Sequence, residues 1–142
     1  MNRPLRFLPP QTLRPHEETI DERLAVVIDL ILCAQTWTRP ICVEAASLCI
    51  MDGHHRHLAA LHLGLAVVPI VTFDYGEVLL GSWTPGLRHD AAELVERAGA
   101  GALLPPKSTR HVFPPFDAPA VPLDRLVGPD RWPVTTGAGR EG

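Results

Sequence analysis

The segment Asp52-Gly53-His54-His55-Arg56 constrains the fold of this chain more than any other part of the sequence. It follows a short apolar run at 48–51 and opens a segment with helical spacing that reaches Gly64. The motif is therefore expected at a strand-to-helix turn, where the first backbone N–H groups of the helix have no internal partners and the helix dipole is positive. Such a turn is a natural site for an anion.

The side chains of this motif extend that prediction. Gly53 allows close approach of the backbone to a ligand, and Arg56 can pair with a phosphate through two donors. Asp52 can hold a divalent cation or orient a histidine. Each residue alone also fits an ordinary helix cap with surface histidines, but together they favour a phosphate site with catalytic groups.

Length and composition indicate one small globular domain. The chain has 142 residues, of which 46% are hydrophobic and 20% are charged. A net charge of −3 argues against non-specific binding to duplex nucleic acid. The apolar runs are too short to span a bilayer, and no signal-peptide core follows the N-terminus, so we expect a cytoplasmic protein without a membrane or nucleic-acid partner.

The first half of the chain contains the clearest secondary-structure signals. A first strand is expected at 6–8, and Thr19-x-x-Glu22 matches a capping box. Behind the box, apolar residues recur on one face of a predicted amphipathic helix, at Leu24, Val27, Ile28, Ile31 and Leu32. The runs at 41–43 and 48–51 read as a hairpin, and the helix after Asp52 is expected to end at Gly64.

The second half is more mixed. A β-rich run at 67–73 contains Pro69, which suggests an edge strand or a bulge. Helical spacing at 90–98 stops at Gly99. From residue 114 onward, proline and glycine replace apolar periodicity. We therefore expect a small α+β domain at 1–113, with a short mixed sheet packed by helices, and an irregular Pro/Gly-rich extension at 114–142.

Two other segments carry chemical groups. Glu17 and Glu18 precede the first long helix, where one carboxylate could act as a general base or both could be ordinary partners of the helix dipole. The segment at 104–111, Leu-Pro-Pro-Lys-Ser-Thr-Arg-His, offers cationic and neutral donors together and suits a carboxylate or a phosphate. It contains Lys107, the single lysine among 13 basic residues.

A structural zinc site is not expected. His55 and His57 are two residues apart and would face different ways on a helix, and no second ligand cluster follows. Magnesium carried by a nucleotide is more consistent with Asp52 beside a phosphate-binding turn.

Several motifs in this order resemble the ParB/sulfiredoxin superfamily, and within it the branch of free L-serine kinases. The motifs are Leu-x-Pro-His-Glu, Arg39-Pro40-Ile41-x-Val43, Asp52-Gly53-His54-His55-Arg56, Leu63-Gly64…Val68-Pro69-Ile70…Asp74-Tyr75 and Pro105-Pro106-Lys107-Ser108-Thr109-Arg110-His111. The resemblance covers roughly residues 5–113. Sulfiredoxins have a catalytic cysteine at the corresponding turn, and this chain has none between Asp52 and Arg56.

The resemblance implies a role for each matching residue. Glu17, with Glu18 as the second candidate, would take the proton of the serine hydroxyl, and Asp52 would position Mg²⁺ or that hydroxyl. Phosphate binding would fall to Gly53, His54, His55 and Arg56, with His55 also acting in catalysis. The amino acid would be held by Lys107, Thr109 and His111, with Ser108 and Arg110 adjacent and Trp83 in the substrate wall.

The resemblance thus implies an enzyme that transfers a phosphoryl group from ATP or ADP to free L-serine or a close hydroxy-amino acid. Its partners would be an amino acid and a nucleotide with Mg²⁺. The main alternative is a non-catalytic nucleotide-binding ParB-like regulatory module, which would need the turn but neither a base nor an amino-acid site. A ParB-like nuclease is a second alternative, disfavoured by the acidic charge balance.

Overall fold

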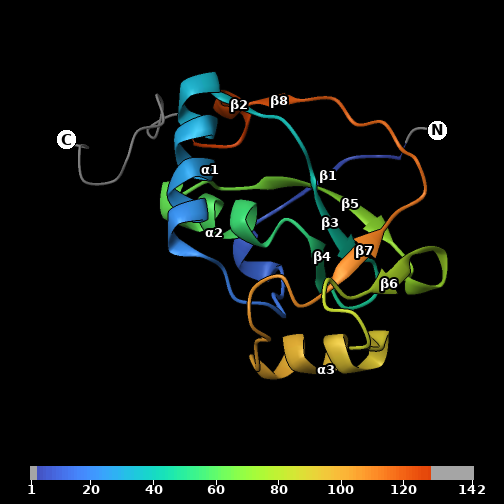
Figure 1. Ribbon diagram of the computed structural model, residues 1–142. Helices are drawn as coiled ribbons and strands as arrows, with labels where there is room; N and C mark the ends of the chain where they lie inside the picture. The colour runs from blue at the N-terminus through green and yellow to red at the C-terminus, as the bar shows by residue number, and fades with distance from the viewer. Residues whose placement is uncertain (1–2, 129–142) are drawn as a thin grey trace.

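A four-stranded mixed sheet forms the centre of the computed structural model, which describes residues 3–128 (Figure 1). Its strands are ordered β1 (Arg6–Leu8), β5 (Val68–Phe73), β3 (Ile41–Glu44) and β4 (Ile50–Asp52). β3 and β5 run parallel, while β1 pairs antiparallel with β5 and β4 pairs antiparallel with β3. The expected hairpin at 41–51 is thus confirmed, and the chain returns from it to the centre of the sheet.

Three helices accompany this sheet. α1 (Asp21–Ala34) and α2 (His54–Leu63) pack against each other, and α3 (Ala91–Ala100) lies apart from them beyond the end of β4 (Figure 1). The apolar face expected of the first long helix is confirmed, because Leu24 and Ile31 are buried and the other three residues pack against the same core. Gly64 ends α2 in the left-handed conformation, as the sequence predicts.

Two small two-stranded sheets contain the remaining strands. β2 (Thr36–Trp37) pairs with β8 (Val121–Pro122), and β6 (Leu79–Gly81) pairs with β7 (Arg110–Val112). Short 3₁₀ turns lie at η1 (Pro10–Thr12), η2 (Tyr75–Glu77) and η3 (Leu123–Arg125).

The apolar core continues past the domain boundary expected at residue 113. Val121, Leu123 and Leu126 are buried with the residues of α1 and the sheet. They were missed because three apolar side chains in a proline-rich stretch form no periodic pattern. The division at 113 remains a prediction, and its part from residue 129 onward lies outside the described residues.

Three local expectations were wrong. The N-cap of α1 is Ile20, which makes no side-chain cap, so Thr19-x-x-Glu22 is not a capping box. β5 is an interior strand, and it tolerates Pro69 because its pairing with β3 begins one residue later, at Ile70. α3 runs through Gly99 and ends at Ala100, and its C-cap residue Gly101 adopts φ +70°.

None of the helices within residues 3–128 combines the length and apolar character needed to cross a membrane.

Candidate active site

A cavity of about 550 Å³ lies between α1, the N-terminus of α2 and the loop that precedes β7. Most of the predicted site residues line it: Glu17, Asp52, Gly53, His54, His55, Arg56, Trp83, Lys107 and Thr109. Glu18, Ser108 and His111 are not among the lining residues. The structure therefore brings together three segments that are distant in the sequence.

The turn from β4 to α2 has the expected form. Asp52 ends the strand, Gly53 adopts φ +109°, and the first helical hydrogen bond joins the His57 N–H to the Gly53 carbonyl at 2.8 Å. The backbone N–H groups of residues 54–56 consequently have no partner within the helix. They lie at the cavity, where they can bind an anion.

The glycine in this turn is required by space as well as by conformation. A Cβ on Gly53 would lie 3.1 Å from Nη2 of Arg56 and 3.3 Å from Cγ1 of Ile41. Both distances are tighter than ordinary contact, and an L side chain is strained at this φ. The turn therefore packs directly on the Arg56 guanidinium.

The Arg56 guanidinium is committed within the protein. Its Nη1 donates to the carbonyl oxygens of Arg39 at 2.9 Å and Pro40 at 2.8 Å. Its Nη2 donates to Oδ2 of Asp52 at 3.1 Å. These bonds tie the turn to the segment before β3, so direct contact of Arg56 with a phosphate remains a prediction.

The two histidines of the motif and the following His57 act as structural anchors. His54 Nε2 accepts the backbone N–H of His16 at 3.2 Å, and His55 Nε2 accepts the backbone N–H of Ile20 at 2.9 Å. His57 donates through Nε2 to the Pro10 carbonyl at 2.8 Å. Burial lowers the pKa of all three rings, and neighbouring histidines lower the pKa of His54 further. The imidazoles are neutral and join α2 to the chain before α1.

Glu17 holds the lysine loop, defined here as residues 105–109. Its Oε2 accepts the backbone N–H of Lys107 at 2.8 Å, and its Oε1 accepts the backbone N–H of Thr109 at 3.3 Å and its hydroxyl at 3.0 Å. Glu18 is exposed, and its backbone N–H donates to Leu104 at 2.8 Å. The resemblance implied Glu17 as the base with Glu18 as the second candidate, and of the two only Glu17 lines the cavity.

The side chains of the lysine loop and its neighbours separate into two groups. Lys107 is exposed at the cavity with φ +59°, and Trp83, 60% exposed, stacks with Arg110 at 5.0 Å. Ser108 instead donates to the Pro105 carbonyl at 2.5 Å, and His111 bonds to the Tyr75 hydroxyl at 2.9 Å. Ser108 and His111 thus stabilise the loop and β7 away from the cavity.

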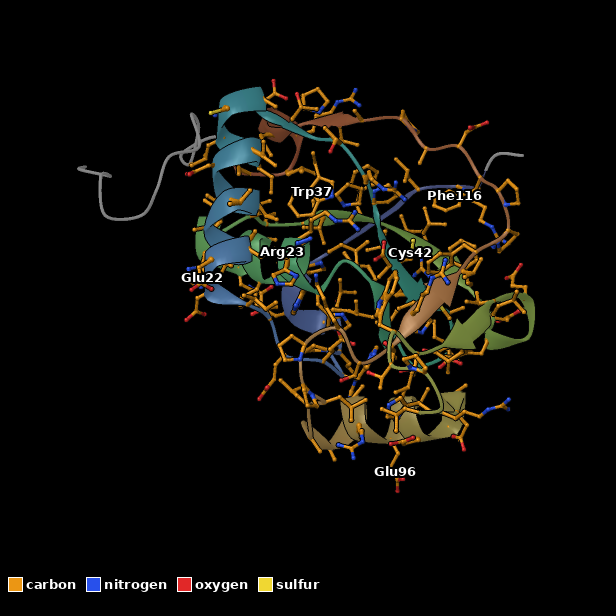
Figure 2. All side chains as sticks on the ribbon, in the orientation of Figure 1. Glu22, Arg23, Trp37, Cys42, Glu96 and Phe116 are labelled. Carbon is orange, nitrogen blue, oxygen red and sulfur yellow. The ribbon has the colours of Figure 1, made fainter. Side chains whose placement is uncertain are left out.

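The structure adds two residues that sequence reasoning did not assign. Arg23 lines the cavity from α1 and points toward α2, whereas its neighbour Glu22 points outward (Figure 2). No ion pair involves Arg23 or Lys107 among the described residues. Arg23 lies four residues before Val27, which belongs to the apolar face of α1. This spacing was the signal that could have placed Arg23 on the side of the helix that faces the cavity.

His16 is the second addition, and it is fully buried. It lies in the Pro-His-Glu-Glu segment directly before Glu17. Its ring contacts Thr109, Cys49 and His54. A lone histidine in a loop gives no sequence signal for such a network.

The residues at the cavity fit a metal only as a nucleotide complex. Within residues 3–128 no group of three or more His, Cys, Asp or Glu side chains could enclose an ion. Asp52 gives Oδ2 to Arg56, and 49% of its side chain is exposed. Mg²⁺ commonly takes one or two carboxylates and completes its shell with phosphates and water, so Asp52 could serve as one ligand.

Comparison with known proteins supplies relatives for this site. No family model matches the sequence. The chain is 36% identical over 95 residues to a ParB-like protein of Sulfolobus acidocaldarius, covering 64% of this chain and 46% of that protein. It is 34% identical over 94 residues to an ATP-dependent L-serine kinase of Desulfurococcus mucosus, covering 62% of this chain and 37% of that kinase.

An ADP-dependent L-serine kinase of Thermococcus kodakarensis is 28% identical over 97 residues, covering 64% of this chain and 40% of the kinase. The matches thus span less than half the length of each of these relatives. A solved structure of free serine kinase in complex with AMP superposes with a TM-score of 0.77 at 16% identity, over 89% of this chain and 95% of that one. The α+β fold with its mixed sheet and three helices is therefore that of free serine kinase.

Proposed function

Because this chain belongs to the family of L-serine kinases and ParB-like proteins, we propose that it transfers a phosphoryl group from ATP or ADP to the hydroxyl of free L-serine or a close hydroxy-amino acid. The observation that carries this proposal is that Glu17 and the open N-terminus of α2 line the same cavity. A carboxylate and an anion site facing one space are what phosphoryl transfer to an alcohol requires.

The phosphates of the donor would lie at the N-terminus of α2. Three backbone N–H groups at 54–56 and the helix dipole attract them. Arg23 and Lys107 contribute two cations that are not neutralised by a described acid, and Asp52 and Arg56 neutralise each other. The cavity therefore complements the negative charge of a polyphosphate and of an amino-acid carboxylate.

The nucleoside would lie along α1. Beyond Arg23 the wall of the cavity becomes apolar through Val27, Leu30, Ile31 and Ala34, and it ends at Thr36 and Thr38. A purine ring buries its faces well against such a surface. This direction leads the nucleotide from the anion site toward the C-terminal end of α1.

The amino acid would lie on the side of the lysine loop. Lys107 would pair with its carboxylate, and Trp83 would close the wall beside it. Its hydroxyl would face Glu17, where three of roughly four acceptor positions are already used and one remains. In the reaction this hydroxyl oxygen attacks the terminal phosphorus, the bond to the leaving nucleotide breaks, and the proton passes to Glu17.

Magnesium, when bound with the nucleotide, would neutralise charge on the transferring phosphoryl group. Asp52 is the residue that would hold it, since its carboxylate is half exposed at the cavity.

A specific observation favours one alternative. The bonds from Glu17 to the lysine loop would also stabilise that loop in a protein that only binds nucleotide. A regulatory nucleotide-binding module would then use the same cavity without chemistry.

Product analysis separates the two functions. The purified protein would be incubated with Mg²⁺, ATP or ADP, and one of L-serine, D-serine, L-threonine or L-homoserine, and analysed by mass spectrometry. A phosphorylated amino acid that forms only in the presence of nucleotide supports the kinase. Saturable nucleotide binding without product from any acceptor supports the regulatory module.

A further inference from the structure

We propose that His16 is a positioning residue of this site: through the Thr109 hydroxyl it fixes the Glu17 carboxylate in the orientation that accepts the substrate proton. This inference rests on the proposed function for its catalytic consequence. Its structural part, a directed hydrogen-bond chain from Cys49, the residue before β4, to Glu17, rests on the contacts of the described residues.

The first step of the chain is set by Thr109. Its side chain is buried, and its hydroxyl lies 3.0 Å from Oε1 of Glu17 and 3.1 Å from Nε2 of His16. An ionised carboxylate can only accept, so the one hydroxyl proton points to Glu17. The hydroxyl must therefore accept from His16, which requires a proton on Nε2.

The second step follows from the neutral ring. With the proton on Nε2, Nδ1 of His16 is an acceptor. The Cys49 thiol lies 3.7 Å from Nδ1, and its other acceptors, the carbonyls of Ile50 and Leu94, lie at 3.8 and 3.9 Å. Donation from the thiol to Nδ1 would complete a chain in which every proton points toward Glu17. The ring also has a hydrogen bond with the Ile50 backbone that raises its pKa and favours a proton on Nδ1 instead, so the tautomer of His16 decides the direction of the chain.

Burial keeps both groups in the required protonation state. It lowers the pKa of His16 to about 4 and raises the pKa of Cys49 to about 12. Around neutral pH the ring and the thiol are both uncharged. Hydrogen bonds aligned in this way polarise one another in a low-dielectric interior, and the carboxylate at the end gains a fixed, well-oriented donor.

The position of His16 is itself fixed from the phosphate turn. Its backbone N–H donates to His54 at 3.2 Å, and the two rings meet edge to face at 4.6 Å between centroids. The direct separation of His16 Nε2 and Glu17 Oε1 is 3.8 Å, too long for a hydrogen bond, so Thr109 is the mediator. His16 therefore links the anion site at α2 to the carboxylate opposite it.

Four single variants and one double variant test the chain. His16→Leu removes the donor, and His16→Gln can return one near the position of Nε2. Thr109→Val removes the hydroxyl in a nearly isosteric side chain, and Thr109→Ser retains it. We expect kcat to fall about 10- to 100-fold in His16→Leu and in Thr109→Val, with nucleotide affinity unchanged. The double variant should be no slower than either single one, and His16→Gln and Thr109→Ser should recover activity.

Two measurements test the hydrogen-bond chain independently of catalysis. Side-chain ¹⁵N NMR should show His16 as the Nε2–H tautomer. Hydrogen exchange at the Lys107 amide, which donates to Glu17, should speed up in His16→Leu and in Thr109→Val but not in Thr109→Ser. If His16→Leu does not fold, Thr109→Val still tests the link to Glu17.

The outcomes are distinct. An Nδ1–H tautomer, or unchanged exchange at Lys107 in the folded variants, overturns the directed chain. A confirmed chain with wild-type kcat in these variants overturns the positioning role. If the wild-type protein has no phosphotransfer activity at all, the proposed function fails, and the NMR and exchange results still decide the chain.

Discussion

The Glu17 carboxylate accepts the backbone N–H of Lys107 at 2.8 Å, which joins two residues 90 positions apart in the sequence. This contact makes the proposed base and the lysine loop one unit, because moving either displaces the other. The three bonds to Glu17 hold the loop in the place where Lys107 and Thr109 line the cavity.

Substitution of Lys107 tests the amino-acid side of the cavity. Lys107→Ala should raise the KM for serine steeply, because the carboxylate loses its cation, while nucleotide affinity stays near that of the wild type. The Glu17 contact uses the backbone of Lys107, so the loop should remain in place. Loss of nucleotide binding with an unchanged KM for serine would place Lys107 on the phosphates instead.

The same lysine offers a chemical check. Since it is the only lysine in the chain, an amine-selective reagent can modify only Lys107 and the α-amino group. Serine should protect Lys107 from modification, and nucleotide alone should not. Equal modification of Lys107 with and without both ligands would indicate that the loop is ordinary solvated surface without a binding role.

Gly53 provides a test of the phosphate turn. Gly53→Ala should weaken nucleotide binding at least 10-fold, because its Cβ would displace Arg56 or Ile41 and shift the N–H groups of α2. Gly101→Ala is the matched control: it also has positive φ, at +70°, but its Cβ would meet open space. It should cost only about 1–2 kcal/mol of stability from backbone strain. Calorimetric titration with ADP would compare the two, and equal affinities would contradict the assignment.

The main effect of replacing Arg56 is predicted to be a loss of folding stability. Arg56→Ala leaves two backbone carbonyls and Asp52 without their donor. Hydrogen bonds to charged groups contribute about 1.5–3 kcal/mol each. The free energy of unfolding measured in urea should therefore fall by at least about 2 kcal/mol. Arg56→Lys should not restore it, because an ammonium lacks the planar fork. A fully stable Arg56→Ala variant without nucleotide affinity would instead assign the guanidinium to the phosphate.

Acid should destabilise the fold through its buried histidines. Burial lowers the pKa of His16 to about 4 and of His111 to about 3, while unfolded histidine titrates near pH 6.5. Between these values the unfolded chain binds more protons, so stability falls as the pH drops below about 6.5. Each such histidine contributes a slope of about 1.4 kcal/mol per pH unit.

Urea unfolding at several pH values measures this slope. His111→Phe should reduce it between about pH 6 and pH 4.5, because the substitution removes one buried histidine whose pKa is lowered in the folded state. A slope in His111→Phe equal to that of the wild type would show that folding does not lower the pKa of His111.

Local patterns predicted much of this fold. The apolar face of α1, the hairpin of β3 and β4, and the end of α2 at Gly64 all depend on interactions between near neighbours. The interior place of β5 and the burial of Leu123 depend on strand pairing and packing between distant segments, which have no periodic signature.

The site shows the same division. The sequence predicted that 52–56 forms a strand-to-helix turn, because a glycine follows an apolar run and precedes helical spacing. The sequence did not predict that the side chains of Arg56 and His55 form hydrogen bonds with backbone groups, because those groups belong to other segments. The resemblance ranked Glu17 before Glu18, but the residues alone gave no reason for this order, because tertiary structure sets the direction of each side chain.

The most direct measurement follows the labelled terminal phosphoryl group of ATP or ADP into serine with wild-type protein and the Glu17→Gln and Glu18→Gln variants. The account predicts labelled O-phosphoserine from the wild type and from Glu18→Gln. Glu17→Gln should bind nucleotide and yet transfer about 10²–10⁴ times more slowly. Equal transfer by Glu17→Gln and the wild type, or loss of transfer in Glu18→Gln alone, would contradict the account.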